Sequence, residues 1–362
     1  MYYWLSEPFL YLGYAILAAI SVLAIVPDRY KPRLAVPAWL GPLAALAVAV
    51  GGFIPLLRIV MFFKSDLGFW KAFNSIMFQF REGEQYAWLL VLVILMAVLA
   101  WIVQRNPRTI TRFLMLPAVL GMAWGLSGFN HAATLFDWLG PVAFLGHFAG
   151  MAFWTGTLLL VGWFSLGSDR WDAFLRWFHP FAILCFVIVM ASGLYLMSGV
   201  APDPVNSWGL SYGQALLVKH ILILPLLVFA FVNGALMKRK LRRESFYRPA
   251  SWARSEGVLI WLIYIVTGYM NQQAAPHEVP DTLAIYGPAP TFLWFHSGFQ
   301  EGALLLQWSW IGIVCLAAGL ALLGGILYAF KCNKGPAFAL LSSLAAIVLL
   351  YCGVMFSITV SA

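Results

Sequence analysis

Ten long apolar segments, separated by short polar connections, constrain this chain more than any other feature of its sequence. Each is long enough to cross a hydrocarbon core of about 30 Å as a helix that rises about 1.5 Å per residue. Because 62% of the 362 residues are hydrophobic and only 10% are charged, no soluble domain of this length could bury so much apolar surface. The sequence therefore predicts an all-α, polytopic transmembrane helical bundle. The predicted spans are 9–26, 38–62, 86–103, 110–130, 138–165, 173–198, 212–237, 252–272, 303–330 and 337–358.

The basic residues predict the orientation of this bundle. Most of the 22 Lys and Arg residues lie in the connections that follow odd-numbered spans. Positively charged connections stay in the cytoplasm, so both termini are predicted to lie outside. The formal net charge of +8 thus reflects topology, and the lipid bilayer, not nucleic acid, is the expected partner. The first apolar segment lacks the basic region that precedes it in a cleavable signal, so we expect it to remain a membrane helix.

Grouping the spans by number predicts four parts. The connection over 273–302 carries His277, His296 and several acids. It is too long to be a simple connector, and it could cover a site or bind a partner. The predicted parts are a first four-helix half at 1–131, a second half at 132–272, an extracytoplasmic loop at 273–302 and a C-terminal hairpin at 303–362.

Several classes of function lack their motifs. There is no Walker motif, no dinucleotide-binding glycine pattern and no phosphorylation motif of an ion-pumping ATPase, so we expect neither an enzyme nor an energy source in this sequence. No Asp or Glu lies in the middle of a predicted span, which disfavours a transporter built on a mid-membrane carboxylate. The four cysteines form no CxxC pair, so neither a disulfide framework nor a zinc knuckle is expected.

Histidines in the outer half of the membrane are the strongest candidates for chemistry. His131 ends the fourth predicted span, and His147 lies about 14 Å into the fifth. Met151 follows His147 by one helical turn and shares its face. His220 lies at a similar depth in the seventh span, about 12 Å from its outer end. Imidazole and thioether ligands suit copper, and Cu(I) especially, so the sequence predicts a metal site of His131, His147, Met151 and His220.

The same histidines allow two other interpretations. Each could simply hydrogen-bond a backbone carbonyl or a hydroxyl group of a neighbouring helix, in which case its role would be structural. Alternatively, two of them on facing helices could hold a b-type haem, either His147 with His220 or His131 with His179. Ionisable groups inside a membrane are more often functional than structural, which favours a metal or haem site.

A series of motifs resembles the copper resistance protein D (CopD) family of bacterial inner-membrane proteins. The resemblance is concentrated in the second half of the predicted eight-helix core. The motifs are Gly128-x-x-His131-Ala132-Ala133, His147-x-x-Gly150-x-x-x-Trp154-x-Gly156, Ser192-Gly193-Leu194-Tyr195, Tyr212-Gly213-Gln214-x-Leu216-Leu217-x-Lys219, Asn233 and Arg254-Ser255-Glu256.

This resemblance implies a copper-related role at the bacterial plasma membrane. It implies His131 and His147 as metal ligands, with copper as Cu(I) or Cu(II), and cooperation with an extracytoplasmic copper chaperone of the CopC type. Two features depart from the family pattern, namely the added C-terminal hairpin and His220 directly after Lys219. We therefore expect a protein that takes copper at an outer His/Met site and moves it across the membrane, with a haem-binding electron carrier as the alternative.

Overall fold

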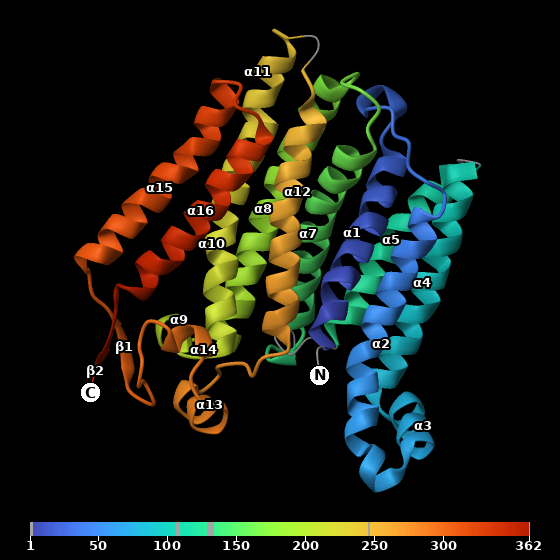
Figure 1. Cartoon of the computed structure of the whole chain (residues 1–362). Coiled ribbons are helices and arrows are strands. Elements are labelled where there is room, and N and C mark those ends of the chain that lie inside the picture. The colour runs from blue at the N-terminus through green and yellow to red at the C-terminus, as the bar shows by residue number, and fades with distance from the viewer. Residues whose placement is uncertain (1–2, 106–108, 129–133, 245–246, 362) are drawn as a thin grey trace. The chain divides into compact units, whose positions relative to one another are not determined.

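Long helices make up most of the protein, as Figure 1 shows for the computed structural model. The structure describes residues 3–105, 109–128, 134–244 and 247–361. Within these ranges, nine helices are long and apolar enough to cross a membrane, which confirms the predicted all-α, polytopic class. The chain divides into two compact units, Met1–Gly199 (unit 1) and Val200–Ala362 (unit 2). The four-part organisation predicted from the number of spans remains a prediction.

Unit 1 is built around its first long helix, α1. Contacts from α2, α4, α5 and α7 surround it, and its Tyr14 is fully buried with its hydroxyl donating to Val119 O of α5 at 2.9 Å. The elements of unit 1 are η1 (Tyr3–Leu5), α1 (Ser6–Ile25), η2 (Asp28–Tyr30), α2 (Leu40–Leu67), α3 (Phe69–Gln79), α4 (Arg81–Arg105), α5 (Thr109–Ser127), α7 (Leu139–Phe164) and α8 (Trp171–Val200).

Two glycines allow neighbouring helices to approach α1 closely. A Cβ atom on Gly13 would lie 2.5 Å from Ala44 O of α2, and one on Gly156 of α7 would lie 2.0 Å from Ala15 O. Both distances are too short for any side chain, so these positions bring the backbones of α1, α2 and α7 together. Gly156 belongs to the motif that begins at His147, which gives that motif a packing role.

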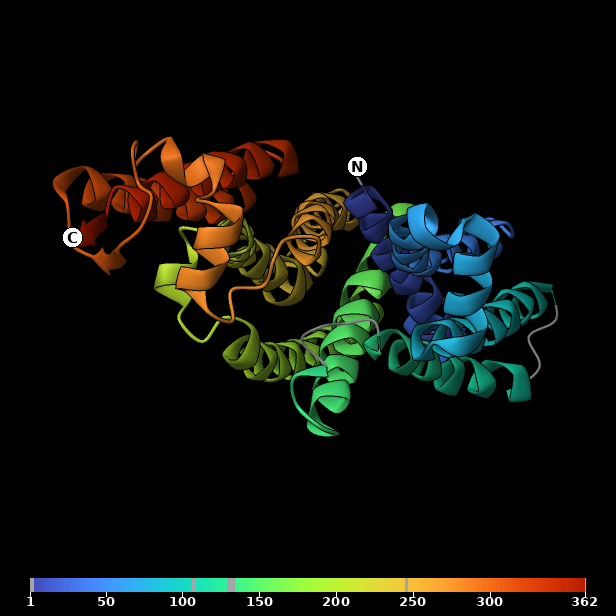
Figure 2. The ribbon, with the colours of Figure 1, turned by 90° about the horizontal axis from the view of Figure 1, so that it is seen from below.

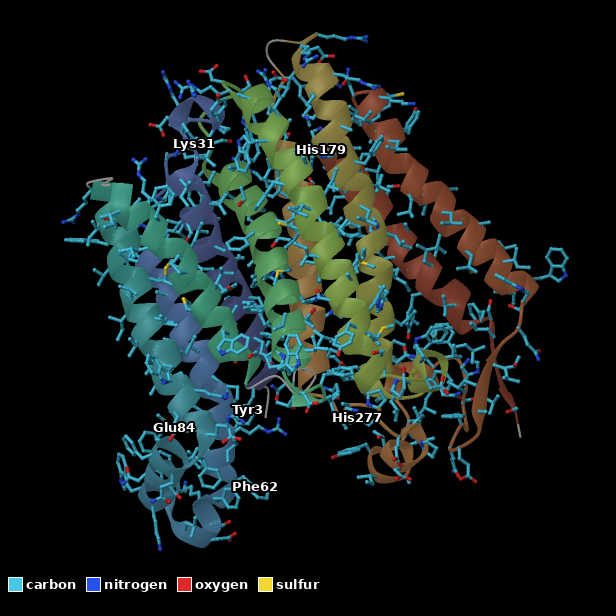
Figure 3. The ribbon with its side chains drawn as sticks, turned by 180° about the vertical axis from the view of Figure 1, so that it is seen from behind. Tyr3, Lys31, Phe62, Glu84, His179 and His277 are labelled. Carbon is cyan, nitrogen blue, oxygen red and sulfur yellow. The ribbon has the colours of Figure 1, made fainter. Side chains whose placement is uncertain are left out.

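The two ends of unit 1 differ in character. Lys31 and His179 lie near one end of the unit, whereas Tyr3, Glu84 and Phe62 lie toward the other (Figure 3). The end of Lys31 carries the basic connections that the positive-inside rule assigns to the cytoplasm. At the opposite end, the short helix α3 and the adjoining end of α2 lie in front of the other helices of the unit when it is seen from below (Figure 2).

Unit 2 centres on α10, which contacts α12, α15 and α16. Nine of the ten predicted spans are helices apolar enough to cross a membrane in the described part of the chain. The tenth is α12, a less apolar helix of 23 residues that carries Arg254 and Glu256. The elements of unit 2 are α9 (Pro204–Ser207), α10 (Ser211–Phe231), the π-helical turn η3 (Val232–Leu236), α11 (Met237–Leu241), α12 (Pro249–Asn271), α13 (Val279–Tyr286), α14 (Pro290–Leu293), β1 (Ala303–Leu306), α15 (Trp310–Lys331), α16 (Pro336–Met355) and β2 (Ile358–Ser361).

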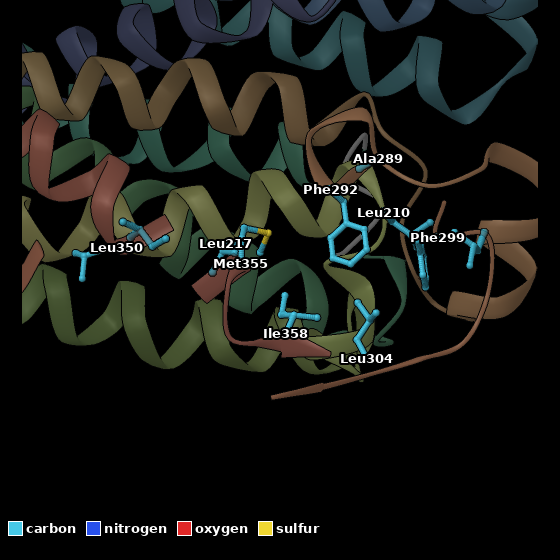
Figure 4. Packing of buried hydrophobic residues seen from close by; sticks show 11 residues of the cluster. Leu210, Leu217, Ala289, Phe292, Phe299, Leu304, Leu350, Met355 and Ile358 are labelled. Carbon is cyan, nitrogen blue, oxygen red and sulfur yellow. The ribbon is translucent and has the colours of Figure 1, made fainter. Parts of the chain in front are cut away.

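The predicted extracytoplasmic loop is folded onto unit 2. Its Phe292 and Phe299 pack with Leu217 of α10 and Met355 of α16 in one apolar cluster (Figure 4). Gln214 joins these parts through polar contacts: its amide donates to Trp208 O at 2.5 Å, and its carbonyl accepts from the hydroxyl groups of Thr291 and Tyr351. The loop is thus an ordered layer over the ends of α10 and α16.

At two of the predicted helix ends, the structure has a β-strand instead. The ninth span was expected to begin at residue 303, but 303–306 is strand β1, paired antiparallel with β2 so that Ala303 lies opposite Ser361. The tenth was expected to end at residue 358, but α16 ends at Met355 and Ile358 begins β2. Helix α15 begins later because Ser309 caps it, its hydroxyl accepting from Gly312 N at 2.9 Å. Hydropathy could not separate these strands from the neighbouring helices, because the residues of both are apolar.

Candidate metal centre

His147 lies in α7 of unit 1, where α8 fixes its ring. Its Nδ1 atom is 2.9 Å from Val189 O of α8. The ring also lies directly against Gly193 of α8, because a Cβ atom there would be 2.8 Å from His147 Cε1 and 2.9 Å from Nδ1. Gly193 therefore makes room for the imidazole, which accounts for the glycine of the Ser192-Gly193-Leu194-Tyr195 motif.

The contact with Val189 determines which ring nitrogen can bind a metal. A backbone carbonyl only accepts hydrogen bonds, so Nδ1 carries the proton and the lone pair lies on Nε2. Histidines that ligate metals usually donate their other ring N–H to a carbonyl or carboxylate in this way, which fixes both the tautomer and the ring orientation. In this tautomer, Nε2 is the ring nitrogen whose lone pair could coordinate a metal.

Met151 stands one turn along the same helix. The hydroxyl group of Thr155 donates to Met151 O at 2.7 Å and also lies 3.5 Å from the thioether sulfur. Met151 is half-buried, whereas Thr155 is buried. The sequence thus places an imidazole and a thioether at neighbouring positions of α7, as the helical spacing predicts.

An aromatic cluster borders the other side of this part of α7. Phe148, next to His147, stacks on Phe144 with a ring-centroid distance of 5.3 Å and contacts Tyr14 at 4.6 Å and Tyr11 at 5.9 Å. The hydroxyl of Tyr11 donates to the carboxyl group of Glu7, and both side chains are buried. Glu7 is a buried acid that the sequence reasoning missed, although its spacing of four residues from Tyr11 was a visible signal.

Of the four predicted ligands, the described part of unit 1 contains His147 and Met151. His131 lies outside the described residues. His220 belongs to α10 of unit 2, where its Nδ1 lies 2.7 Å from Leu216 O of the preceding turn. Among the residues that the structure describes, no group of three or more His, Cys, Asp or Glu side chains could hold a metal ion. In that part of the chain, the candidate centre consists of His147 and Met151.

The three other histidines lie in the outer loop of unit 2 and near the basic end of unit 1. His296 Nε2 lies 3.1 Å from Met355 O, and its ring stacks on Phe292 at 4.5 Å, so it holds the outer loop against α16. It is therefore less solvated than a free loop histidine would be. His277 lies in the same loop, half-buried before α13, and His179 lies near the basic end of unit 1 (Figure 3), as expected for a residue at the membrane interface.

Comparisons with known proteins match part of the chain. The family model of copper resistance protein D matches residues 172–270. The inner membrane protein YebZ of Escherichia coli (strain K12) is 28% identical over 208 residues, which cover 51% of this chain and 64% of YebZ. The chain thus spans just under two thirds of the length of that relative. No solved structure matches it. The matched range includes Val189 and Gly193, which hold His147, but not His147 itself.

Proposed function

Because residues 172–270 match the family model of copper resistance protein D, we propose that this protein takes copper at an outer His/Met site and moves it across the bacterial plasma membrane. Its long apolar helices make it a multi-pass membrane protein. The similar protein YebZ is described as an inner membrane protein. The proposal gives the protein a role in copper homeostasis and assigns it no catalytic reaction.

The observation that carries this proposal is the arrangement of His147. Its Nδ1–H is held by Val189 O and its ring by Gly193, so Nε2 is presented for a metal in one orientation. The thioether of Met151 supplies a soft second ligand, which favours Cu(I) over harder ions. In the proposal, His131 completes the primary set, and His220 of unit 2 acts as a relay for the ion.

A separate chain is proposed as the copper donor. In the proposal, a CopC-type chaperone binds at the extracytoplasmic side. The proposed direction of movement is inward, from that chaperone to the cytoplasm.

Haem is the second candidate ligand, and the same feature of His147 favours it. An axial haem histidine also needs a fixed tautomer and ring orientation. His147 with His220, or His131 with His179, would supply the axial pair. Under this alternative the protein would be an electron carrier.

Metal analysis of the purified protein separates these two proposals. We expect about one copper ion per chain after loading with Cu(I), with no Soret band in the absorption spectrum, since the site offers imidazole and thioether ligands. Mass spectrometry for metals and an absorption scan provide both measurements. A reducible Soret band would instead assign the histidines to haem, and protein that binds neither ligand would contradict both proposals.

Replacing Gly193 by alanine tests the support of His147. The added Cβ would lie 2.8 Å from His147 Cε1, so the ring must move away from Val189 O. Loss of such supporting contacts typically costs about 10- to 100-fold in metal affinity, and we expect a decrease in that range. Titration with Cu(I) against a competing chelator measures it. Gly125→Ala is the matched control, because its Cβ would lie 3.9 Å from the nearest atom, on Leu89; equal affinities of the two variants would contradict the assigned role of His147.

A further inference from the structure

Unit 2 contains a buried carboxyl group that the proposed copper site does not use. Glu256 of α12 is 1% exposed. Asn233 donates its side-chain amide to Glu256 Oε2 at 2.7 Å and to Trp252 O at 3.3 Å. Trp252, one turn before Glu256, is itself buried against Phe229 and Phe330, so aromatic rings cover this end of the helix.

The backbone that carries Asn233 is irregular. Residues Val232–Leu236 form the π-helical turn η3 between α10 and α11. Such turns are rare and occur frequently at functional sites, because they give up regular helical hydrogen bonding in order to reposition a side chain. Here the repositioned residue is Asn233, whose side chain is buried and directed at Glu256.

Among the described residues, no cation pairs with the Glu256 carboxyl group. Burial and the hydrogen bond from Asn233 are the two influences on its charge. The elements packed against α12 include α10, η3 and α16, and also α15, whose Phe330 contacts Trp252; η3 has no titratable side chain. His220, the nearest titratable residue of α10, is thirteen residues, or about 20 Å of helix, from Asn233. Lys240 of α11 lies over the rings of Tyr247 and Phe330 instead. The titratable residues of these elements are Tyr212, Lys219 and His220 on α10, Tyr351 and Cys352 on α16, and Cys315, Tyr328 and Lys331 on α15.

These surroundings determine the charge of Glu256. An ionised carboxylate buried with one amide donor and no cation loses far more hydration energy than that hydrogen bond returns. The group therefore holds its proton while Asn233 covers it. A glutamine would make the same hydrogen bond, so the property that distinguishes glutamate at this position is its ability to release and take up a proton.

We propose that Glu256 is a proton-binding site that exchanges its proton with the cytoplasmic side when the Asn233 contact opens. On opening, water reaches the carboxyl group, its O–H bond breaks and the proton passes to water, leaving a carboxylate; closing reverses these steps. Glu256 lies seven residues after Pro249, the start of α12, or about 10 Å from that end of the helix. This end follows the strongly basic connection that the positive-inside rule assigns to the cytoplasm.

A second part of the proposal concerns coupling and rests on the proposed copper transport. Movement of a positive copper ion inward is accompanied by release of the Glu256 proton to the cytoplasmic side. The released proton offsets the charge of the entering ion; because it exchanges with one side only, it draws no energy from a proton gradient. The carboxyl group lies near one end of its helix, so it differs from the mid-membrane carboxylate that the sequence disfavours.

Infrared difference spectroscopy of the purified, full-length protein tests the proton site directly. At neutral pH we expect the carbonyl band of a protonated carboxyl group in the wild type, lost in Glu256→Gln and retained in Glu84→Gln, whose parent side chain is exposed. Asn233→Ala keeps the carboxyl group but removes its donor, so its band is expected to shift. Identical bands in the wild type and in Glu256→Gln would overturn the proposal, and thermal unfolding confirms that the variants are folded.

Vesicles containing the purified protein, a pH-sensitive dye and a Cu(I)-sensitive dye test the coupling. With external Cu(I) we expect copper entry and a pH change in the wild type, and loss of the copper-dependent pH change in Glu256→Gln. An unaltered pH change in that variant would contradict the coupling. Absence of copper entry in the wild type would contradict the proposed transport function instead, while the infrared result still decides whether Glu256 binds a proton.

Discussion

Replacing His147 with alanine is expected to abolish stoichiometric copper binding to the purified protein. The change removes the nitrogen ligand that Val189 O and Gly193 hold in place. Because losing only an outer contact of a ligand costs about 10- to 100-fold in affinity, loss of the ligand itself should cost more than about 100-fold. The measurement is the copper content of the protein after loading with Cu(I) and removal of the unbound ion.

His179→Ala is the matched control for this experiment. His179 is also a half-buried histidine of unit 1, but it lies at the basic end of the unit (Figure 3), so its removal should leave copper binding unchanged. His220→Ala tests the relay role and should retain the bound ion while slowing its passage. Full copper content in His147→Ala would show that the site has been assigned to the wrong residue.

Replacing Gly156 with leucine is expected to destabilise unit 1 more than any other single change proposed for it. The new Cβ would lie 2.0 Å from Ala15 O and 2.6 Å from Ala15 C. These are backbone atoms of α1, so no rotation of a side chain relieves the overlap, and α7 must move away from α1. Forcing extra atoms into a packed interior costs about 3 kcal/mol at the upper end of the usual range. Thermal unfolding in detergent measures the loss.

Gly324→Leu controls for the substitution itself. Gly324 lies in α15, and a Cβ atom there would meet no other atom within 4 Å, so we expect an unchanged unfolding temperature. Equal stability of the Gly156 and Gly324 variants would mean that α1 and α7 do not depend on their close approach at Gly156.

The sequence predicted the fold class well because hydropathy and length report directly on membrane helices. It could not place the start of α15, since the apolar residues of β1 pair with a strand more than fifty residues later. Nor did it predict α9 or α14, helices of four residues each, which pack on other elements of unit 2. The amino-acid composition of a short segment does not indicate which distant residues it will contact.

The candidate site was predicted only in part, for a similar reason. Helical spacing placed His147 beside Met151, because both lie on one helix. The partners that fix the ring, Val189 and Gly193, are more than forty residues further on and belong to α8. Glu256 was visible in the sequence as an acid near the start of a span. Its hydrogen bond with Asn233 comes from a π-helical turn, which no sequence pattern predicted.

The unequal lengths of the helices in unit 1 have a consequence for the lipid around it. The 28 residues of α2 extend about 42 Å, whereas the 19 residues of α5 extend about 28 Å, close to the thickness of a hydrocarbon core. A hydrocarbon core that α5 just spans leaves the far end of α2 in the headgroup layer. This part of the chain carries the exposed rings of Phe62 in α2 and of Trp70 and Phe78 in the adjoining α3. Aromatic side chains favour this layer, so they would hold the unit at one depth when the membrane becomes thicker or thinner.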